Sequence, residues 1–323
     1  MKKLIIQIPC YNEEKTLPVT LKEIPRKIKG VNQVEILVID DGSTDRTVDV
    51  AKENNVDHIV KLTNNKGLAE GFLAGLDACL RLGADIIVNT DGDNQYNGAD
   101  IQKLIEPILK GNADIVVGDR QVDTIAHFSG MKKKLQHVGS WVVRQVSGTK
   151  IPDTTSGFRA FSQEAALKLN VVSRFSYTLE TIIQAGKKNI AITHVPVETN
   201  SRLRESRLFK STLSYLKRSI ATIVRIYTMY EPIKTFFLIG SVIFSGGLIL
   251  SLRYLYFYFF TPFGGKGHIQ SLILATVLFI VGFQVMVIGL LSDVIAANRR
   301  LLEDTLYRVK KLELKANKND KQG

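Results

Sequence analysis

The sequence predicts an α/β domain with a mostly parallel sheet, followed by an amphipathic helix and two membrane-spanning helices. Over residues 1–120, short apolar runs alternate with helix-period patterns, which is typical of βαβ units. From residue 207 to 229, apolar residues recur at helical spacing among lysines and arginines. Beyond residue 234, two uncharged apolar stretches each reach the roughly 18–20 residues that cross a bilayer as a helix.

Each predicted strand is a short apolar run with turn-forming residues on both sides. They lie at residues 4–8, 35–39, 58–62, 85–89, 114–117 and, after a less regular region, 190–197. Helix patterns occupy residues 14–29, 44–54, 67–82 and 101–109, and Asp or Ser stands at several helix starts, as N-caps require. In such sheets ligands bind beyond the carboxyl ends of the strands, so the polar residues that follow each strand are the candidates for a site.

The C-terminal third has the composition of a membrane-bound segment. Residues 1–200 carry 25 Lys/Arg and 24 Asp/Glu, whereas residues 201–323 carry 18 and 7, so the last third holds +11 of the net charge of +12. Basic residues beside apolar spans favour an anionic membrane or a lipid phosphate as partner and argue against nucleic acid. Residues 207–232 are predicted to form an amphipathic juxtamembrane helix at the interface, with an ordinary surface helix as the alternative.

The two apolar stretches are predicted to form a transmembrane hairpin over residues 233–297, with spans at about 234–260 and 270–292. Positive residues crowd both outer flanks, while the connecting loop carries only Lys266. By the positive-inside rule, residues 1–206 and the basic tail of residues 298–323 lie in the cytoplasm, as expected of a multi-pass plasma-membrane protein. Two buried helices of a soluble protein are the alternative, and the sequence leaves open whether the spans assemble into a homo-oligomer.

The strongest chemical signal follows the strand at residues 85–89. Asp91 and Asp93 stand one residue apart there, with Gln95 beyond them. Two carboxylates and an amide oxygen are hard ligands that suit Mg²⁺ or Mn²⁺, and these ions keep positions open for phosphate oxygens. A bare Asp-x-Asp is often a solvated loop, but this one stands in register with other polar strand ends. We therefore predict a divalent-metal site at this position.

Other strand ends carry groups suited to a nucleotide diphosphate. Tyr11 could stack on a base, and Glu13 could accept hydrogen bonds from it. Asp40 begins the run DDGSTD and could accept from a base N–H or a ribose hydroxyl, although a turn with an N-cap explains the same letters. Arg120 could hold a phosphate by a bidentate fork, or form a salt bridge with Asp119 or another neighbour.

The motifs PCYNE, DDGSTD, NNKG and DGDNQ stand in this order with strand spacing. Together they resemble the inverting family 2 glycosyltransferases of GT-A fold, a Rossmann-like architecture, and most of all the dolichyl-phosphate mannose synthases and bacterial polyprenyl-phosphate glycosyltransferases. The resemblance covers about residues 1–210. It implies catalytic roles for Asp91, Asp93 and Arg120, with metal and diphosphate at Asp91, Asp93 and Gln95. The nucleotide-binding residues that it implies are Pro9, Tyr11, Glu13, Val38, Asp40, Gly67, Asp91 and Gly92.

The resemblance also implies a site for an acceptor phosphate. The family's acceptor loop follows a late strand and carries Arg and Lys six residues apart, a spacing that Arg204 and Lys210 match. The implied acceptor-phosphate residues are Arg202, Arg204, Ser206 and Lys210. The run DTTSGFR at residues 153–159 also resembles this branch, and is interpreted either as a loop that lines the sugar and acceptor cleft or as a turn before the next helix.

The resemblance implies transfer of a sugar from a UDP-glucose-like or GDP-mannose-like donor to polyprenyl phosphate, with Mg²⁺ or Mn²⁺ as cofactor. Two alternatives stay open. One is a membrane glycosyltransferase with a hydroxyl acceptor, for which Glu180 is the candidate base, and the other is a non-catalytic nucleotide-sugar-binding protein. A processive polysaccharide synthase is not favoured, because its Gln-x-x-Arg-Trp signature is absent around Trp141, the only tryptophan.

Overall fold

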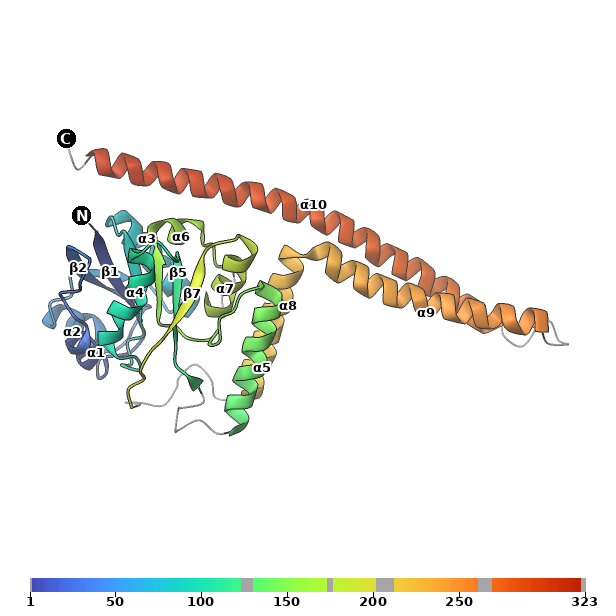
Figure 1. The fold of residues 1–323 in the computed structure, drawn as a ribbon, viewed down its shortest axis with the longest axis horizontal. Coiled ribbons are helices and arrows are strands. Elements are labelled where there is room, and N and C mark those ends of the chain that lie inside the picture. Colours follow the sequence, from blue (N-terminus) through green and yellow to red (C-terminus); the bar gives the residue numbers. More distant parts are fainter. Residues whose placement is uncertain (1, 123–129, 173–176, 202–211, 261–268, 321–323) are drawn as a thin grey trace. The chain divides into compact units, whose positions relative to one another are not determined.

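The computed structural model describes residues 2–122, 130–172, 177–201, 212–260 and 269–320. The chain divides into one unit of Met1–Ile223 with Asp304–Gly323 and a second unit of Val224–Glu303. The first unit holds a seven-stranded sheet in the order β3-β2-β1-β4-β6-β5-β7 (Figure 1). β6 is antiparallel to both of its neighbours and the other pairings are parallel. The predicted α/β class with a mostly parallel sheet is therefore confirmed.

The described strands lie close to the predicted ones. Their bounds are β1 Lys3–Cys10, β2 Gln33–Asp40, β3 His58–Lys61, β4 Ile86–Asn89, β5 Ile115–Asp119, β6 Arg159–Ser162 and β7 Ile192–Pro196. The helices that connect them are α1 Leu17–Glu23, α2 Thr47–Glu53, α3 Leu68–Arg81, the short 3-10 helix η1 Gly98–Asp100, α4 Ile101–Leu109, α5 Gly130–Ser147, α6 Gln163–Lys168 and α7 Tyr177–Lys187. The helices that follow are α8 Thr212–Tyr230, α9 Pro232–Phe260 and α10 Ile269–Asp320.

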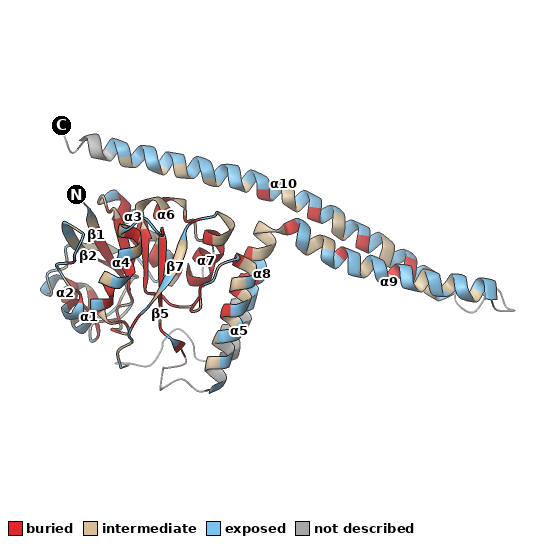
Figure 2. Ribbon diagram, in the orientation of Figure 1, coloured by how far each residue is buried: buried red, intermediate tan, exposed pale blue. Residues whose placement is uncertain are grey.

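Helices cover both faces of the sheet because successive strand residues point to opposite sides. Leu4, Ile6 and Ile8 of β1 pack into one buried cluster with residues of α1, α2 and α4. Ile5 packs on the other face with residues of α3, α6 and α7. Figure 2 shows the buried strands between these helices. This rigid sheet fixes where β1, β2 and β4 end, and the candidate site lies at those ends.

Two local predictions differ from the structure for identifiable reasons. The helix predicted over residues 14–29 ends at Glu23, because Pro25 disfavours helical backbone at Ile24, whose ψ is 119°. The strand β6 was not predicted as a strand. It has four residues and begins with a charged side chain, Arg159, so it offers too short a pattern for strand periodicity to show.

The second unit contains the apolar hairpin. α9 and α10 are both long and apolar enough to cross a membrane, and only 11% and 17% of their most apolar stretches is buried. Core helices of a soluble protein would be mostly buried, so the alternative of two core helices is not favoured. α10 continues as one helix to Asp320 and therefore includes most of the predicted basic tail. Within the first unit, the Tyr307 hydroxyl of α10 donates to Glu164 Oε1 of α6 at 2.6 Å.

Glycines bring α9 and α10 close together, as small residues do in membrane helix pairs. A Cβ on Gly282 would lie 2.9 Å from Phe244 N and 3.0 Å from Gly240 O. We expect Gly282→Ala to overpack this contact, at a cost of about 1–3 kcal/mol. The matched control is Gly246→Ala, since a Cβ there would lie 3.7 Å from its nearest neighbour, Leu278 Cδ1. The apparent Tm of the purified protein in detergent should fall for Gly282→Ala only, and equal values for the two variants would contradict the packing.

Candidate active site

The loops after β1 and β2 are bonded to each other. The two strands end side by side, with Cys10 paired to Asp40. Beyond them, Asn12 N donates to Ser43 Oγ at 2.9 Å, and Thr44 N donates back to Asn12 Oδ1 at 2.8 Å. The predicted nucleotide segments PCYNE and DDGSTD therefore form one surface at the carboxyl edge of the sheet.

The loop after β3 joins the same edge through Asp41. Its two carboxylate oxygens accept hydrogen bonds from Lys66 N at 2.8 Å and Gly67 N at 2.9 Å. Gly42 has a φ of +70°, and a Cβ there would lie 2.5 Å from the carbonyl carbon of Asn64. Only glycine permits this approach, so Gly42 and Asp41 together hold the predicted NNKG segment beside the nucleotide loops.

The predicted nucleotide-binding residues differ in what they can offer a ligand. Tyr11 is 39% exposed, so its ring is available for stacking. Glu13 is buried and accepts a hydrogen bond from the Thr16 hydroxyl. Asp40 is fully buried, and its Oδ2 has no hydrogen-bond partner among the described residues. Its other oxygen, Oδ1, accepts from Ser43 N at 3.0 Å. Buried acceptors are normally satisfied, so Oδ2 is the oxygen of this carboxylate that still lacks a donor. Val38 is fully buried and belongs to the hydrophobic core.

The loop after β4 carries the predicted metal ligands Asp91 and Asp93. Its backbone turns tightly, because Asn94 has a φ of +56° and Asp93 Oδ1 accepts from Gln95 N at 3.2 Å. Within the described residues, no group of three or more His, Cys, Asp and Glu is placed to bind a metal. The donor set nevertheless fits Mg²⁺ or Mn²⁺, since two carboxylates and an amide oxygen leave positions for phosphate oxygens and water.

Gly157 packs against the loop after β4 that holds the predicted metal ligands Asp91, Asp93 and Gln95, called the metal loop below. A Cβ on Gly157 would lie 3.1 Å from both carboxylate oxygens of Asp91. Gly157 N donates to the buried Tyr96 hydroxyl at 3.0 Å, and its carbonyl accepts from Asn89 Nδ2 at 2.9 Å. Burial raises the pKa of Tyr96 to about 12, so this phenol stays protonated at neutral pH. Gly157 therefore brings the end of the segment 153–157 beside the loop that carries Asp91.

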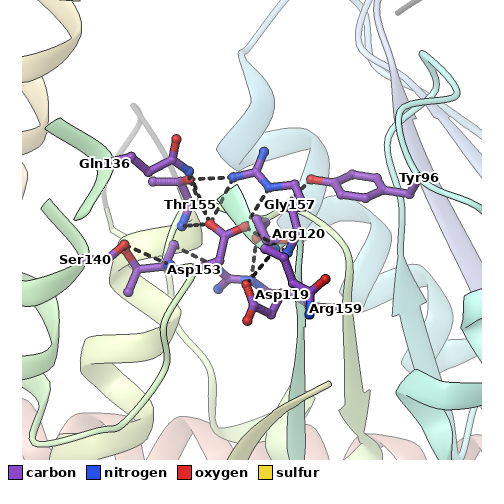
Figure 3. Close-up of polar contacts among 12 residues, drawn as sticks. Tyr96, Asp119, Arg120, Gln136, Ser140, Asp153, Thr155, Gly157 and Arg159 are labelled. Carbon is purple, nitrogen blue, oxygen red and sulfur yellow. Dashed lines mark hydrogen bonds and ion pairs between the residues drawn. The ribbon is translucent and has the colours of Figure 1, made fainter. Parts of the chain in front are cut away.

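Arg120 forms a buried ion pair with Asp153 (Figure 3). Its Nε donates to Asp153 Oδ2 at 2.6 Å, and its Nη2 donates to Asp153 Oδ1 at 2.9 Å. Nη2 also donates to the Thr155 hydroxyl at 2.7 Å. Of the two interpretations of Arg120, the structure shows the salt bridge, with Asp153 rather than Asp119 as partner. Burial by itself would raise the pKa of Asp153, but the charge and hydrogen bonds of Arg120 hold it below its usual value.

Arg159 contacts the segment 153–157 through hydrogen bonds, and it forms no ion pair among the described residues. It is fully buried, and its guanidinium donates to the carbonyls of Thr154 at 3.0 Å, Ser156 at 2.8 Å and Thr178 at 2.8 Å. Burial lowers the pKa of Arg159 to about 10. A buried cation satisfied by loop carbonyls fixes the path of residues 154–156, and with it the position of Asp153.

Several site predictions lie elsewhere in the chain. The acceptor residues Arg202, Arg204, Ser206 and Lys210 are outside the described residues. The candidate base Glu180 is fully buried, and its Oε1 accepts from Val172 N at 2.9 Å and from Gln184 Nε2 at 3.2 Å, which ties it to the interior of the fold. The sequence motifs gave no role to Tyr96, Asp153, Gly157 or Arg159, although the run DTTSGFR marks the segment that holds the last three.

A mostly parallel sheet with the PCYNE, DDGSTD and DGDNQ loops at one edge has the architecture of a GT-A glycosyltransferase. The chain belongs to glycosyl transferase family 2, whose sequence profile matches residues 5–169. The predicted family and the predicted enzyme class are thus confirmed.

Curated relatives include enzymes with lipid-phosphate acceptors. The UDP-N-acetylglucosamine–dolichyl-phosphate N-acetylglucosaminyltransferase of Methanococcus voltae is 32% identical over 220 residues, which cover 61% of this chain and 86% of that protein. Glycosyltransferase AglJ of Haloferax volcanii is 27% identical over 316 residues, covering 95% of this chain and 97% of that protein.

Solved structures agree with the fold. Glucosyl-3-phosphoglycerate synthase from Mycobacterium tuberculosis, in complex with Mn²⁺, UDP-glucose and phosphoglyceric acid, matches with a TM-score of 0.56. It is 20% identical, and the match covers 70% of this chain and 80% of that one. At this identity the likeness establishes the shared fold.

Proposed function

We propose that this enzyme transfers a sugar from a nucleotide-diphosphate sugar to polyprenyl phosphate, with inversion, at the cytoplasmic face of the plasma membrane. The observation that carries the proposal is one sheet edge where the Asp91–Asp93 loop lies with the buried Asp40 carboxylate, in a chain with two membrane-length apolar helices. The relatives include a dolichyl-phosphate N-acetylglucosaminyltransferase and a polyprenol monophosphomannose synthase, which supports a lipid-phosphate acceptor.

On the donor side, Asp40 accepts a hydrogen bond from the base or ribose, and Tyr11 stacks on the base. Asp91, Asp93 and Gln95 would hold Mg²⁺ or Mn²⁺, which when bound would supply positive charge to the nucleotide diphosphate. Arg120 stays beside this loop because Asp153 fixes its guanidinium. Nη1, the nitrogen that Asp153 and Thr155 do not engage, is the one we assign to a diphosphate oxygen.

On the acceptor side, the nucleophile is a phosphate monoester oxygen, already anionic near neutral pH. It needs no strong general base, so the enzyme contributes positioning and electrostatics. The phosphate oxygen bonds to the anomeric carbon as the bond from that carbon to the nucleotide diphosphate breaks, and this single displacement inverts the centre. We assign the acceptor phosphate to Arg202, Arg204, Ser206 and Lys210.

A transfer screen tests the reaction directly. Several radiolabelled nucleotide sugars, including UDP-glucose, UDP-N-acetylglucosamine and GDP-mannose, are each incubated with the protein and one polyprenyl phosphate. We expect label in a lipid-phosphate product with one donor, and nucleotide-diphosphate release that depends on the lipid. Label that enters a hydroxyl-bearing glycolipid instead, or release that is indifferent to polyprenyl phosphate, would overturn the proposal.

Removal of one acceptor cation should weaken acceptor binding selectively. A lost charge-assisted contact to phosphate is worth ~1.5–3 kcal/mol, so Arg204→Ala and Lys210→Ala should each raise the KM for polyprenyl phosphate about tenfold or more. The KM for the nucleotide sugar should change little. Arg225→Ala, an exposed cation on α8, is the matched control. With a short, detergent-soluble prenyl phosphate, an unchanged KM in both variants would exclude the assignment of these two residues.

The proposed topology can be tested in intact cells. Lys266→Cys places a thiol in the loop predicted to face outward, and Glu313→Cys places one in the tail predicted to face the cytoplasm. The native Cys10 and Cys79 are buried and should not react with the thiol reagent. An impermeant thiol reagent should label Lys266→Cys alone, whereas labelling of Glu313→Cys alone would invert the topology.

A further inference from the structure

The end of α1 braces the metal loop, although no sequence motif pointed to this helix. Thr20 Oγ1 donates to the carbonyl of Gly92 at 3.2 Å, and Glu23 Oε1 accepts from Asn94 Nδ2 at 3.0 Å. A Cβ on Gly98 would lie 2.4 Å from the carbonyl oxygen of Glu23, so the backbone after the metal loop is seated directly on the helix end. These contacts bracket Asp93 and Gln95 without involving either side chain.

The Glu23–Asn94 bond fixes the residue between two predicted metal ligands. Asn94 has a φ of +56°, a left-handed conformation that asparagine tolerates and most residues avoid. Its side chain is buried, and Oδ1 has no hydrogen-bond partner among the described residues. The bond from Nδ2 to the Glu23 carboxylate is therefore the hydrogen bond that orients this amide. A carboxylate acceptor makes it stronger than a bond between neutral groups.

The same carboxylate also holds a second segment of the chain. Glu23 Oε2 accepts from Asn200 Nδ2 at 2.8 Å, and Asn200 N donates to the carbonyl of Gln95 at 2.9 Å. One residue earlier, Thr199 forms an antiparallel bridge with Tyr96. The segment before residue 201 thus runs alongside the metal loop, and Glu23 forms hydrogen bonds with both of these segments. In the sequence, the residues assigned above to the acceptor phosphate follow directly.

We propose that Glu23 is a positioning residue that ties the metal loop to the segment leading to the acceptor residues, so that donor and acceptor geometry are set together. In its acceptor half, this inference rests on the proposed function. Glu23 acts through Asn94 and Asn200 and is itself an exposed side chain on the last turn of α1. Its loss should therefore change substrate constants far more than it changes global stability.

The test uses the full-length protein in detergent and three readouts: the Mn²⁺ concentration for half-maximal rate, the KM for polyprenyl phosphate, and the apparent Tm. Glu23→Ala should raise both constants about threefold to tenfold, with little change in Tm. Glu23→Gln retains one acceptor oxygen and should give intermediate values. The matched control is Glu106→Ala, which removes an exposed glutamate that pairs with Lys110 on α4.

A double variant tests the coupling itself. Asn200 Nδ2 donates to Glu23 Oε2 at 2.8 Å and reaches the Tyr96 carbonyl only at 3.5 Å, so its bond to Glu23 is the stronger of the two. Asn200→Ala added to Glu23→Ala should therefore raise the acceptor KM little further. If the half-maximal Mn²⁺ concentration and the KM for polyprenyl phosphate are both unchanged in Glu23→Ala, the positioning role is overturned, whether or not the Tm falls. If the unsubstituted protein does not use polyprenyl phosphate, the proposed function fails, but the metal dependence of donor hydrolysis still tests the link between Glu23 and the metal loop.

Discussion

Asp93→Asn should reduce the rate of sugar transfer at least about a hundredfold with either Mg²⁺ or Mn²⁺. It removes one of the two carboxylate ligands of the proposed metal site and so leaves the negative charge of the diphosphate without its cation. Charge stabilisation by a bound cation is worth several kcal/mol in the transition state, and each ~1.4 kcal/mol is tenfold in rate. Asn keeps an oxygen that can accept from Gln95 N, as Asp93 does at 3.2 Å, so the loop should retain its path. The measurement is nucleotide-diphosphate release over a titration of each metal.

The control for this variant is Asp77→Asn on α3, which removes an exposed carboxylate that pairs with Arg81 and lies outside the loop after β4. Its rates and metal dependence should match those of the unsubstituted protein. The apparent Tm of Asp93→Asn should also stay close to that of the unsubstituted protein. Near wild-type transfer by Asp93→Asn with both metals would remove the metal assignment, and with it the role given to Asp91.

Parts of the fold with strong periodic patterns could be predicted from the sequence. Long buried strands such as β1 and β2 and the apolar helices α9 and α10 each bury or expose a continuous apolar run, so the pattern alone identifies them. β6 could not be predicted in this way. Its position between β4 and β5 depends on tertiary pairing, and its first residue, Arg159, is charged yet fully buried because carbonyl groups of other segments satisfy it.

In the candidate site, too, some residues could be predicted from the sequence and others could not. Asp40 is the last residue of β2, and Asp91 and Asp93 lie in the loop after β4, so the rule that ligands bind at strand ends selects all three as candidates. The partner of Arg120 was not predictable, because Asp153 lies 33 residues away and reaches it only through the antiparallel return of β6. Glu23 was missed for a similar reason, since its two bonds join segments that lie far apart in the sequence.

Arg120→Met should reverse the pH dependence of stability, because it leaves Asp153 buried without its cation. Removing one partner of a buried ion pair typically costs about 3–5 kcal/mol of unfolding free energy. In the unsubstituted protein the pKa of Asp153 is lowered on folding, so the stability it contributes is complete above the usual aspartate pKa of about 3.9 and is lost as pH falls through the folded value. Between pH 5 and about 8 this contribution is therefore flat.

In Arg120→Met the same carboxyl, 1% exposed, has lost the guanidinium charge and its hydrogen bonds, while the bonds from the Thr155 hydroxyl and from the backbone N–H of residue 120 remain. Burial, the largest single effect on its pKa, then raises that pKa. A raised folded pKa gives stability that is present at low pH and lost as pH rises, so the apparent Tm should fall from about pH 5 to 8. Adding Asp153→Asn removes the buried charge and should restore much of the Tm and flatten its pH dependence. If Arg120 also serves the diphosphate, this double variant should regain stability while transfer stays low. A Tm that follows pH in parallel with the unsubstituted protein would show that Asp153 does not depend on Arg120.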